Sequence, residues 1–449
     1  MTKSEMTPKK LKIILVNYRF FVSGGPERYM FNVINLLQRN GHEVIPFSIK
    51  HTRNKHSDYE SYFMSPVGKG DEVYAKEYKK NDLKTVVTAL GRMLYSFEAK
   101  KRLEILIKDV KPDLIYVLHY QNKISASIFD AAVKYNIPVV NRISDFGQIC
   151  ANSLLFRPKQ KDVCERCIHG SKWNAVKYKC VNDSYVYSAI KATSLVVAER
   201  VVKINSKINA FVVPSAFTVL KLAEYGIDRK KLHHIPTFFN SQTTEEPEKI
   251  SYQPFALYLG RIVQEKGLLT LIKAFFNTSY NLKIIGFTDT DYHQELEDFL
   301  KDKPHNIEFL GGKSFKEIIP YLQTCAFTIV PSENYDNFPN TVLESFAYKK
   351  AVIATNLGSL KETVINEVTG LLFKQQDFLD LQEKIAFLFA NPALCELYGS
   401  NAYHKLWDEY SDEKHYQKLM NVFLAVVNKE EIQTKVLSNS RSLDIERDI

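Results

Sequence analysis

Short apolar runs rich in Val, Ile, Leu and Phe alternate with longer helical patterns along nearly the whole of this 449-residue chain. Such alternation is typical of parallel β-sheets whose strands are joined by helices, and it argues against an all-α or an all-β fold. The runs form two series, and a chain of this length exceeds what one hydrophobic core usually serves. The sequence therefore predicts an α/β protein with two domains, each built on a parallel sheet.

A polar stretch at 241–254, rich in Thr, Glu and Pro, separates the two series and is interpreted as a linker. It divides an N-terminal domain at 11–240 from a C-terminal domain at 255–411. A final helical pattern at 412–429 carries apolar residues on one face, so we expect a C-terminal helix that packs back on the N-terminal domain. The predicted strands are 12–17, 43–49, 114–119, 138–143 and 210–214 in the first domain, and 256–261, 282–286, 307–311, 326–330, 351–355 and 370–373 in the second.

The ends of the chain, residues 1–10 and 430–449, are polar and are expected to be flexible. No apolar run approaches the roughly 18 to 20 residues that cross a bilayer. The apolar stretch at 11–16 is too short for a signal peptide. We therefore expect a cytoplasmic protein.

The formal net charge of +9 favours anionic partners. No recognisable nucleic-acid-binding module accompanies the charge, so an anionic membrane surface is a better candidate than nucleic acid. The basic, amphipathic pattern at 94–110 could lie on such a surface, or it could be a helix packed on the N-terminal domain. The sequence leaves both interpretations open, and with them a peripheral position on the inner face of the cell membrane.

The turn after the first predicted strand contains Gly24 and Gly25, followed by Pro26 and a helical pattern. Paired glycines let the backbone turn sharply and approach a ligand, and a helix N-terminus binds anions. This turn could cradle a phosphate or an acceptor sugar. The full dinucleotide-binding fingerprint of three spaced glycines is missing, so an ordinary turn explains the pattern equally well.

The second domain opens with a stronger signal. Gly260 and Arg261 end its first strand, and Lys266 precedes the next helix. Because ligands of such folds bind at the carboxyl edge of the sheet, these two cations could clamp a diphosphate there. The alternative is that both are surface charges on an ordinary loop.

A polar loop at 331–339 follows another strand and leads into a helix. Asp336 lies in the loop, and Glu344 lies eight positions later on the helix. Carboxylates accept strong hydrogen bonds from the hydroxyls of a sugar and of a ribose, so this pair could bind both. Taken alone, Asp336 is better explained as a helix cap.

Together these segments resemble glycosyltransferase family 4, the retaining enzymes of the GT-B fold, in which two Rossmann-like domains face each other. The resemblance runs from residue 11 to about 416 and extends to bacterial enzymes of surface-polysaccharide synthesis. Its specific parts are Gly260-Arg261 with Glu265-Lys266-Gly267, the acidic pair around Asn337-Phe338-Pro339-Asn340, and the stretches 354–359 and 369–372.

The resemblance implies a hexosyltransferase that moves a sugar from a UDP- or GDP-linked donor to a glycan acceptor, one carried on a lipid in capsule or O-antigen synthesis. Arg261 and Lys266 match the pair that holds the donor diphosphate, and Glu344 matches the carboxylate on the ribose. Asp336 matches the acid that faces the donor sugar. In relatives the leaving phosphate helps to deprotonate the acceptor, so no dedicated protein nucleophile is required. No cofactor is expected for catalysis. The remaining matching positions are Gly260, Asn337, Phe338 and Asn340 at the donor, and Gly24 and Gly25 at the phosphate or acceptor.

Three positions depart from the family pattern. Asp336 replaces a glutamate and shortens its reach, Ser144 stands where many relatives have a histidine, and Phe287 makes a usually glycine-rich loop bulkier. His119 and Asp145 could line the cleft near Ser144, although a lone histidine at a strand end is often structural. These departures keep two alternatives open: an epimerase or sugar-phosphate synthase on the same fold, and a catalytically silent member that binds a glycan or a partner.

Four of the six cysteines fall in a predicted insertion at 150–180: Cys150, Cys164, Cys167 and Cys180. The two-residue gap between Cys164 and Cys167 is typical of a zinc knuckle, and stable disulfides are rare in the cytoplasm. The outer spacings are irregular, so a structural zinc site and four reduced thiols both remain possible. The acidic pair at 289 and 291 is interpreted as a helix cap rather than a catalytic metal site.

Overall fold

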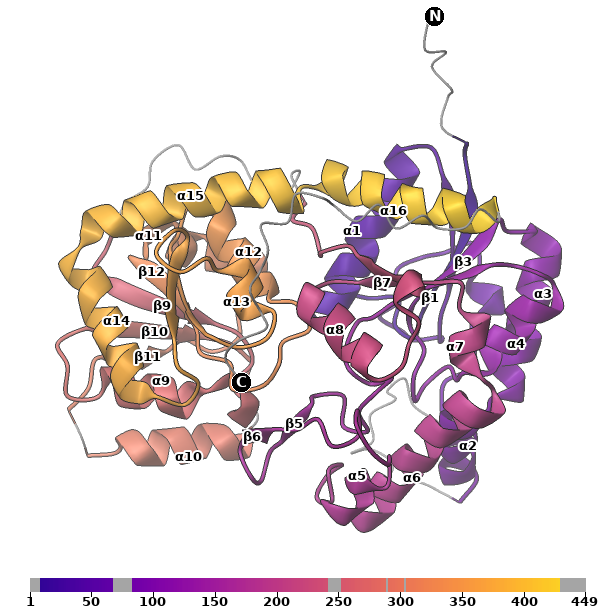
Figure 1. Cartoon of the computed structure of the whole chain (residues 1–449), viewed down its shortest axis with the longest axis horizontal. Helices are drawn as coiled ribbons and strands as arrows, with labels where there is room; N and C mark the ends of the chain where they lie inside the picture. Colours follow the sequence, from indigo (N-terminus) through magenta and orange to yellow (C-terminus); the bar gives the residue numbers. More distant parts are fainter. Residues whose placement is uncertain (1–8, 68–82, 241–251, 288–289, 303, 429–449) are drawn as a thin grey trace, which may run out of the picture.

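The computed structural model describes residues 9–67, 83–240, 252–287, 290–302 and 304–428. Most of the predicted linker, Asp289 and nearly all of the two predicted tails lie outside these residues. The chain forms two six-stranded sheets, one in each half, and all pairs of neighbouring strands in them are parallel. Figure 1 shows the two halves side by side. The predicted α/β fold with two parallel sheets is confirmed.

The N-terminal sheet has the strand order β2-β1-β3-β4-β7-β8. Its strands are almost completely buried, as expected for a parallel sheet covered on both faces. The strand β8 was not predicted, because its sequence Leu-His-His is short and polar. The strands are β1 (Lys12–Asn17), β2 (Glu43–Phe47), β3 (Leu114–His119), β4 (Val139–Arg142), β7 (Ala210–Val213) and β8 (Leu232–His234).

The C-terminal sheet repeats this plan with the order β11-β10-β9-β12-β13-β14. In both sheets the first strand of the half lies inside the sheet and the order reverses beside it. Loops diverge at such a reversal and leave room for a ligand at the carboxyl edge. The strands are β9 (Phe255–Leu259), β10 (Asn281–Ile285), β11 (Ile307–Phe309), β12 (Phe327–Val330), β13 (Val352–Thr355) and β14 (Gly370–Phe373).

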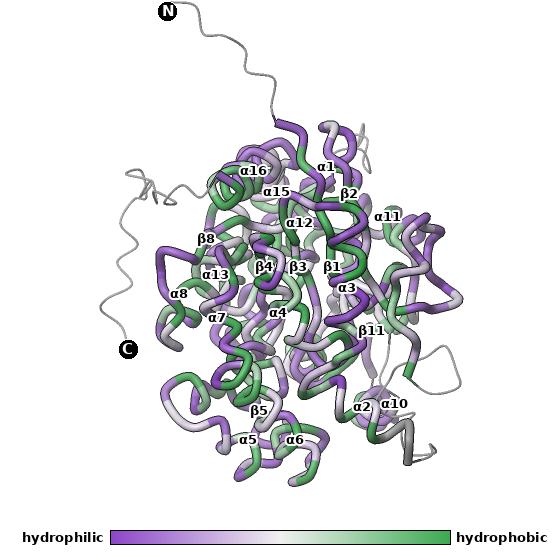
Figure 2. Tube along the Cα trace, turned by 90° about the vertical axis from the view of Figure 1, so that its right-hand side faces the viewer, coloured by the Kyte–Doolittle hydropathy of each residue, from purple (hydrophilic) through white to green (hydrophobic). Residues whose placement is uncertain are grey.

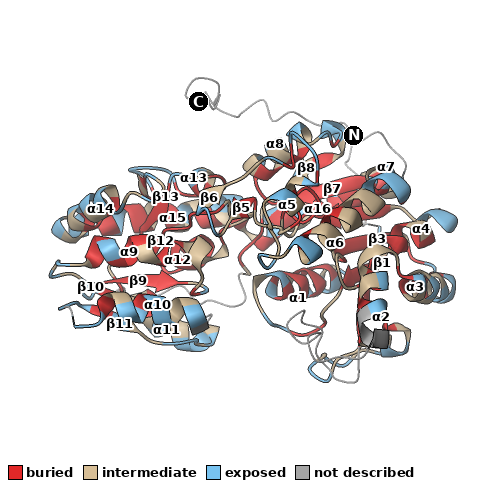
Figure 3. Ribbon diagram, turned by 90° about the horizontal axis from the view of Figure 1, so that it is seen from below, coloured by how far each residue is buried: buried red, intermediate tan, exposed pale blue. Residues whose placement is uncertain are grey.

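Helices cover both faces of each sheet. Hydrophobic residues gather in the strands (Figure 2), and the buried residues concentrate in the strands and in the inner helix faces (Figure 3). The N-terminal half contains α1 (Gly25–Arg39), α2 (Leu83–Leu94), α3 (Phe97–Val110), α4 (Ser127–Lys134), α7 (Ile204–Lys207) and α8 (Ala216–Glu224). The C-terminal half contains α9 (Leu268–Phe275), α10 (Thr290–Leu300), α11 (Phe315–Thr324), α12 (Asn340–Ala347), α13 (Leu360–Thr363), α14 (Phe378–Ala390) and α15 (Pro392–Tyr410).

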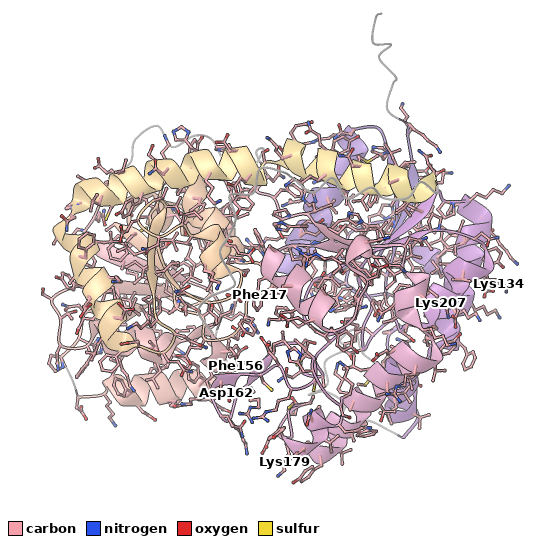
Figure 4. All side chains as sticks on the ribbon, viewed as in Figure 1. Lys134, Phe156, Asp162, Lys179, Lys207 and Phe217 are labelled. Atoms are coloured by element: carbon pink, nitrogen blue, oxygen red, sulfur yellow. The ribbon has the colours of Figure 1, made fainter. Side chains whose placement is uncertain are left out.

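An insertion between β4 and β7 extends below the N-terminal sheet and towards the other half (Figure 1). It holds a two-stranded antiparallel hairpin and two helices. Figure 4 labels Phe156, Asp162 and Lys179 in this part of the molecule. Its elements are β5 (Phe156–Arg157), β6 (Asp162–Val163), α5 (Asn174–Lys177) and α6 (Tyr185–Val196), which continues into a π-helical turn at Val197–Val201.

The last helix, α16 (Asp412–Val427), returns to the N-terminal half, as Figure 1 shows. Leu419, Met420 and Phe423 are buried in the core of that half, and the Phe423 ring lies 5.1 Å from that of Tyr116. At the crossing, the backbone N–H of Phe239 donates to the carbonyl of Tyr410 at 2.9 Å. The predicted packing of the C-terminal helix on the N-terminal domain is confirmed.

The pattern at 94–110 is a packed helix. Leu94 ends α2, and α3 begins at Phe97 after a break capped by Ser96. Its apolar face, which includes Leu103 and Leu106, is buried in the core of the N-terminal half. That face is therefore covered by protein and is unavailable to a membrane. Within the described residues, no helix combines the length and the apolar character needed to cross a bilayer.

Candidate active site

The first loop of the C-terminal half is shaped by two glycines with positive φ. Gly260 has φ +159° and Gly267 has φ +70°. A Cβ on Gly267 would lie 2.0 Å from the carbonyl oxygen of Pro331, so only glycine lets this loop approach the loop that follows β12. The backbone N–H of Glu333 donates to the carbonyl of Glu265 at 2.9 Å and fixes the same contact. The two signals that the sequence places about 70 residues apart therefore form one surface at the carboxyl edge of the sheet.

Lys266 and Asp336 form an ion pair on this surface, and both side chains are mostly buried. The ammonium group of Lys266 also lies 3.4 Å from the Ser332 hydroxyl. Arg261 is different, because its side chain is 62% exposed and its contact with Glu265 is long, at 3.6 Å. An exposed guanidinium beside a fixed ammonium group can turn towards an incoming diphosphate. The structure thus pairs Lys266 with Asp336 and leaves Arg261 extended at the rim.

Glu344 lies on α12 and reaches across to the N-terminal half. Its Oε1 lies 2.9 Å from Nη1 of Arg28 on α1. Glu344 is 8% exposed. Burial raises the pKa of Glu344, and the Arg28 guanidinium only partly opposes that effect. Burial between the two halves disfavours the ionised form of this carboxylate, and a group in such an environment is a candidate for binding ligand hydroxyls.

The loop before α12 also touches the N-terminal half. Nδ2 of Asn337 donates to the carbonyl of Ile143 at 2.9 Å, and its Oδ1 accepts from the Thr218 hydroxyl at 3.1 Å. A Cβ on Gly25 would lie 3.0 Å from the Asn340 amide nitrogen, so Gly25 and Asn340 face each other. Gly24, the residue before α1, has extended backbone. The glycine turn of the N-terminal half therefore lies against the start of α12 in the C-terminal half.

Phe338 is half-buried. Its ring packs with the hydrophobic cluster of the C-terminal half and lies 5.9 Å from the Tyr410 ring on α15. The contact of Phe338 with a donor stays a prediction. Its side chain anchors the loop that presents Asp336 and Asn337.

His119 and Asp145 come from the ends of adjacent strands and lie together. His119 Nε2 is 3.4 Å from Asp145 Oδ2, and the backbone N–H of Gly147 donates to Asp145 Oδ1 at 2.7 Å. Burial opposes ionisation of Asp145, but His119 and the Gly147 N–H outweigh it and lower the pKa of Asp145. Ser144 donates its hydroxyl proton to the carbonyl of Leu118 at 2.8 Å. An imidazole is thus present beside Ser144, supplied by the neighbouring strand.

Three polar residues of this region were missed by the sequence reasoning. Glu362 on α13 accepts the backbone N–H groups of Ala216 and Phe217, the first residues of α8 in the other half. Glu333 is buried and accepts from the Thr270 hydroxyl at 2.7 Å. Arg142 is buried and donates to the Thr237 hydroxyl at 2.6 Å. Glu362 and Arg142 belong to no local motif, so only a tertiary contact could identify them, whereas Glu333 lies in the polar loop at 331–339 that the sequence singles out. In Figure 4 Phe217 is labelled at the boundary between the halves.

Three neighbouring cavities are lined by described residues of the N-terminal half. A small cavity lies beside His119 and Asp145 and shares Gln121 and Gln148 with a second one. The second shares Asn122 and Lys191 with a third, of about 500 Å³, beneath the insertion. The charged side chains that line this third cavity are four cations and one carboxylate: Arg157, Lys159, Lys179, Lys191 and Asp183.

Cys150, Cys164, Cys167 and Cys180 are all free thiols in the insertion. Burial raises the pKa of Cys167 to about 11 and that of Cys180 to about 12. Cys325 and Cys395 are buried in the core of the C-terminal half.

Residues 240–405 match the family model of glycosyl transferases group 1, and this segment contains Arg261, Lys266, Asp336 and Glu344. The C-terminal half therefore carries a glycosyltransferase family domain. The matched segment corresponds approximately to the part of the chain that forms the second sheet and its helices.

Curated relatives bear similar names. An uncharacterized glycosyltransferase of Methanocaldococcus jannaschii is 38% identical over 33% of this chain and 41% of its own length. The capsular polysaccharide biosynthesis glycosyltransferase CapM of Staphylococcus aureus is 27% identical over 43% of this chain and 52% of its own. The N,N'-diacetylbacillosaminyl-diphospho-undecaprenol alpha-1,3-N-acetylgalactosaminyltransferase of Campylobacter jejuni is 28% identical over the same shares. This chain thus spans about half the length of these relatives.

Solved structures share the fold along almost the whole chain. Sucrose-phosphate synthase from Thermosynechococcus elongatus has a TM-score of 0.66 at 17% identity. The match covers 94% of this chain and 100% of the chain of that protein. The Anabaena protein HepE, solved with UDP-glucose, has a TM-score of 0.62 at 14% identity, with coverages of 92% and 100%. At this level of identity the likeness shows the fold alone, which is GT-B.

Proposed function

We propose that this chain is a retaining glycosyltransferase of family 4 that transfers a hexose from a nucleotide-sugar donor to an anionic, lipid-linked glycan acceptor in surface-polysaccharide synthesis. The observation that carries the proposal is the joining of Lys266, Asp336 and the Arg261 loop at the carboxyl edge of a parallel sheet. This edge lies in the segment that matches glycosyl transferases group 1.

On the donor side, Lys266 and Arg261 bind the diphosphate and stabilise the negative charge that grows on it as the sugar departs. The ion pair with Asp336 holds the Lys266 ammonium group in place before the donor arrives. Asp336 then accepts hydrogen bonds from the hydroxyls of the sugar. Preorganised charges of this kind need little rearrangement in the transition state, and therefore favour it over the bound substrate.

Glu344 binds the ribose hydroxyls of the nucleotide. Because Arg28 already contacts Oε1 of Glu344, the ribose binds at a junction that both halves build. The carboxylate is buried, so hydrogen bonds to it are stronger than they would be at an exposed site. No protein nucleophile is required when the leaving phosphate takes the proton of the acceptor hydroxyl on the same face of the sugar.

On the acceptor side, the cationic cavity beneath the insertion supports an acceptor that carries negative charge, such as a lipid diphosphate. Arg157 and Lys159 are paired with Asp162 and Asp183, so Lys179 and Lys191 give the cavity lining a positive charge that favours an anion. Burial lowers the pKa of Lys191 to about 8, so Lys191 is still mainly protonated at neutral pH. The relative from Campylobacter jejuni has a name that describes a diphospho-undecaprenol acceptor. Association with the membrane would follow from such a lipid rather than from α3.

The test is nucleotide release from a panel of UDP- and GDP-sugars, measured with a lipid-linked and with a soluble acceptor. We expect release that depends on one matched donor and on the lipid-linked acceptor. Arg261→Ala and Glu344→Ala are expected to lose most of the activity, by about 10- to 100-fold in kcat/KM. Unchanged turnover in either variant would contradict the role given to that residue.

The same assay separates the two alternatives. Sugar-phosphate synthesis would use a soluble sugar phosphate as acceptor, and epimerisation would change the sugar without net transfer to a glycan. A silent binding protein would show no release with any donor while still binding a glycan or a partner. Each of these results would replace the proposed function.

A further inference from the structure

The four cysteines of the insertion come from four turns that converge. Cys150 lies in the turn after β4, Cys164 directly follows β6, Cys167 lies in the next turn, and Cys180 follows α5. Nζ of Lys172 donates to the carbonyls of Ile149 and Cys167, at 2.9 and 3.1 Å, and Cys180 packs against a cluster that includes Ala151. The irregular spacing in the sequence therefore becomes one cluster in space.

The Cys150 thiol is held by a hydrogen bond of its own. Its Sγ–H donates to Oδ1 of Asn152 at 3.0 Å, and the same oxygen accepts the backbone N–H of Leu154 at 3.1 Å. A metal ion would take the place of this thiol proton, because metals bind the thiolate.

The backbone ties the two pairs of cysteines to each other. The N–H of Cys164 donates to the carbonyl of Leu155 at 2.8 Å, so the turn after Cys150 is fastened to the CxxC segment. Leu155 has φ +49°, in the left-handed region that a leucine rarely adopts. A strained turn of this kind persists only where its surroundings hold it.

The outer part of the insertion has little apolar packing of its own. Its hydrophobic cluster has three buried members, Ala151, Ala175 and Ala192, with Cys180 packed against them. Three methyl groups bury far less surface than the Leu and Phe side chains of the two main cores. Small segments with so little core are usually stabilised by a metal or by disulfides.

A neighbouring group of acids does not compete as a metal site. Among the described residues, Glu165, His169 and Glu224 are the potential ligands whose atoms all lie within 4.8 Å of one another. However, the Lys221 ammonium group lies 2.9 Å from Glu165 and 3.0 Å from Glu224. That cation already neutralises the acids. The four sulfurs are spaced more widely, so binding a metal would draw the CxxC turn onto Cys150 and Cys180.

We propose that Cys150, Cys164, Cys167 and Cys180 bind one Zn²⁺ ion as four thiolates, in a structural site that holds the insertion against the N-terminal half. Binding would release four protons and change no oxidation state, and would leave a complex of charge −2. Lys172 lies near Cys167, and Arg157 lies near Cys180, so cations offset that charge. Zinc with four sulfur ligands is tetrahedral, with Zn–S distances of about 2.3 Å. The proposal does not depend on the proposed function.

The test is metal analysis of the purified full-length chain. We expect about one zinc per chain in the native protein, and little or none in Cys164→Ser or Cys180→Ser. The matched controls are Cys325→Ser and Cys395→Ser, which change buried thiols of the C-terminal half and should keep the zinc.

A second measurement avoids variants that fail to fold. A mercurial reagent is titrated into the native chain while a chromogenic indicator reports free zinc. Release should be complete once about four thiols have reacted. Cobalt exchanged into the site should give intense thiolate-to-metal absorption. Reduced thiols without zinc, disulfides among the four cysteines, bound iron, or zinc retained in both serine variants would each overturn the proposal.

Discussion

The C-terminal half carries its candidate groups on neighbouring βα loops, whereas the N-terminal half assembles its side of the cleft from separate strand ends and a long insertion. Lys266 and Asp336 meet because Gly267 lets adjacent loops touch. His119 and Asp145 meet because β3 and β4 are neighbours in the sheet. The comparison indicates that a half with short loops keeps its site in local motifs, while a half with an insertion hides its site in tertiary contacts.

The two halves also differ in how their charged side chains are arranged. The C-terminal edge presents ion pairs that span its own loops, while the N-terminal side contains connected cavities, one of which is lined by more cations than carboxylates. The strand order does not explain this contrast, because in both sheets the order reverses beside the first strand. If the halves divide donor and acceptor binding between them, substitutions in each should affect different kinetic constants.

The largest effect is expected from Lys266→Met. The change removes the buried ammonium group beside Asp336 while keeping most of the side-chain volume. We expect kcat/KM for the donor to fall by about 100- to 1,000-fold, the usual loss when one preorganised charge is removed from a transition state. Lys273→Met, on the exposed face of α9, is the matched control and should keep wild-type kinetics. Equal activity of the two variants would end the assignment of the donor site to this edge.

An intermediate effect is expected from His119→Gln, which tests the other half. Glutamine keeps a hydrogen-bond donor but loses the imidazole that contacts Asp145. We expect roughly a tenfold loss that appears in kcat or in the acceptor KM, with the donor KM unchanged. The exposed His404 on α15 supplies the control, His404→Gln. A change confined to the donor KM would show that the halves do not divide the substrates as proposed.

The smallest effect is expected on stability, in Glu344→Gln. Burial raises the folded-state pKa of Glu344, so the ionised carboxylate reduces stability as pH rises through that pKa. Replacing it with a neutral amide should raise Tm at pH 7 by about 2–4 °C. The gain should vanish near pH 4, where the wild-type carboxyl group is protonated. Thermal scans at both pH values measure this, with the exposed Glu383→Gln as the control. A lower Tm at pH 7 would mean that the pair with Arg28 outweighs burial.

The sequence predicted more of the C-terminal half than of the N-terminal half. Gly260, Lys266 and Asp336 lie in contiguous patterns, and their places in the loops follow from where a parallel strand ends. The packing of the Phe338 ring against Tyr410 was not predicted, because a motif position does not reveal which way an aromatic ring packs. The strand β8 was missed, since its pairing with β7 rather than its polar sequence makes it a strand.

Apolar periodicity by itself determined the α/β class, the two series of strands and the returning C-terminal helix, because strand and helix repeats are local properties of the chain. Only the tertiary structure decided which residues meet across the halves: Arg28 with Glu344, Asn337 with Ile143, and Glu362 with the start of α8. It also gathered the four cysteines. Such contacts join residues far apart in sequence, and their geometry depends on how two independently folded sheets pack, which no local pattern encodes.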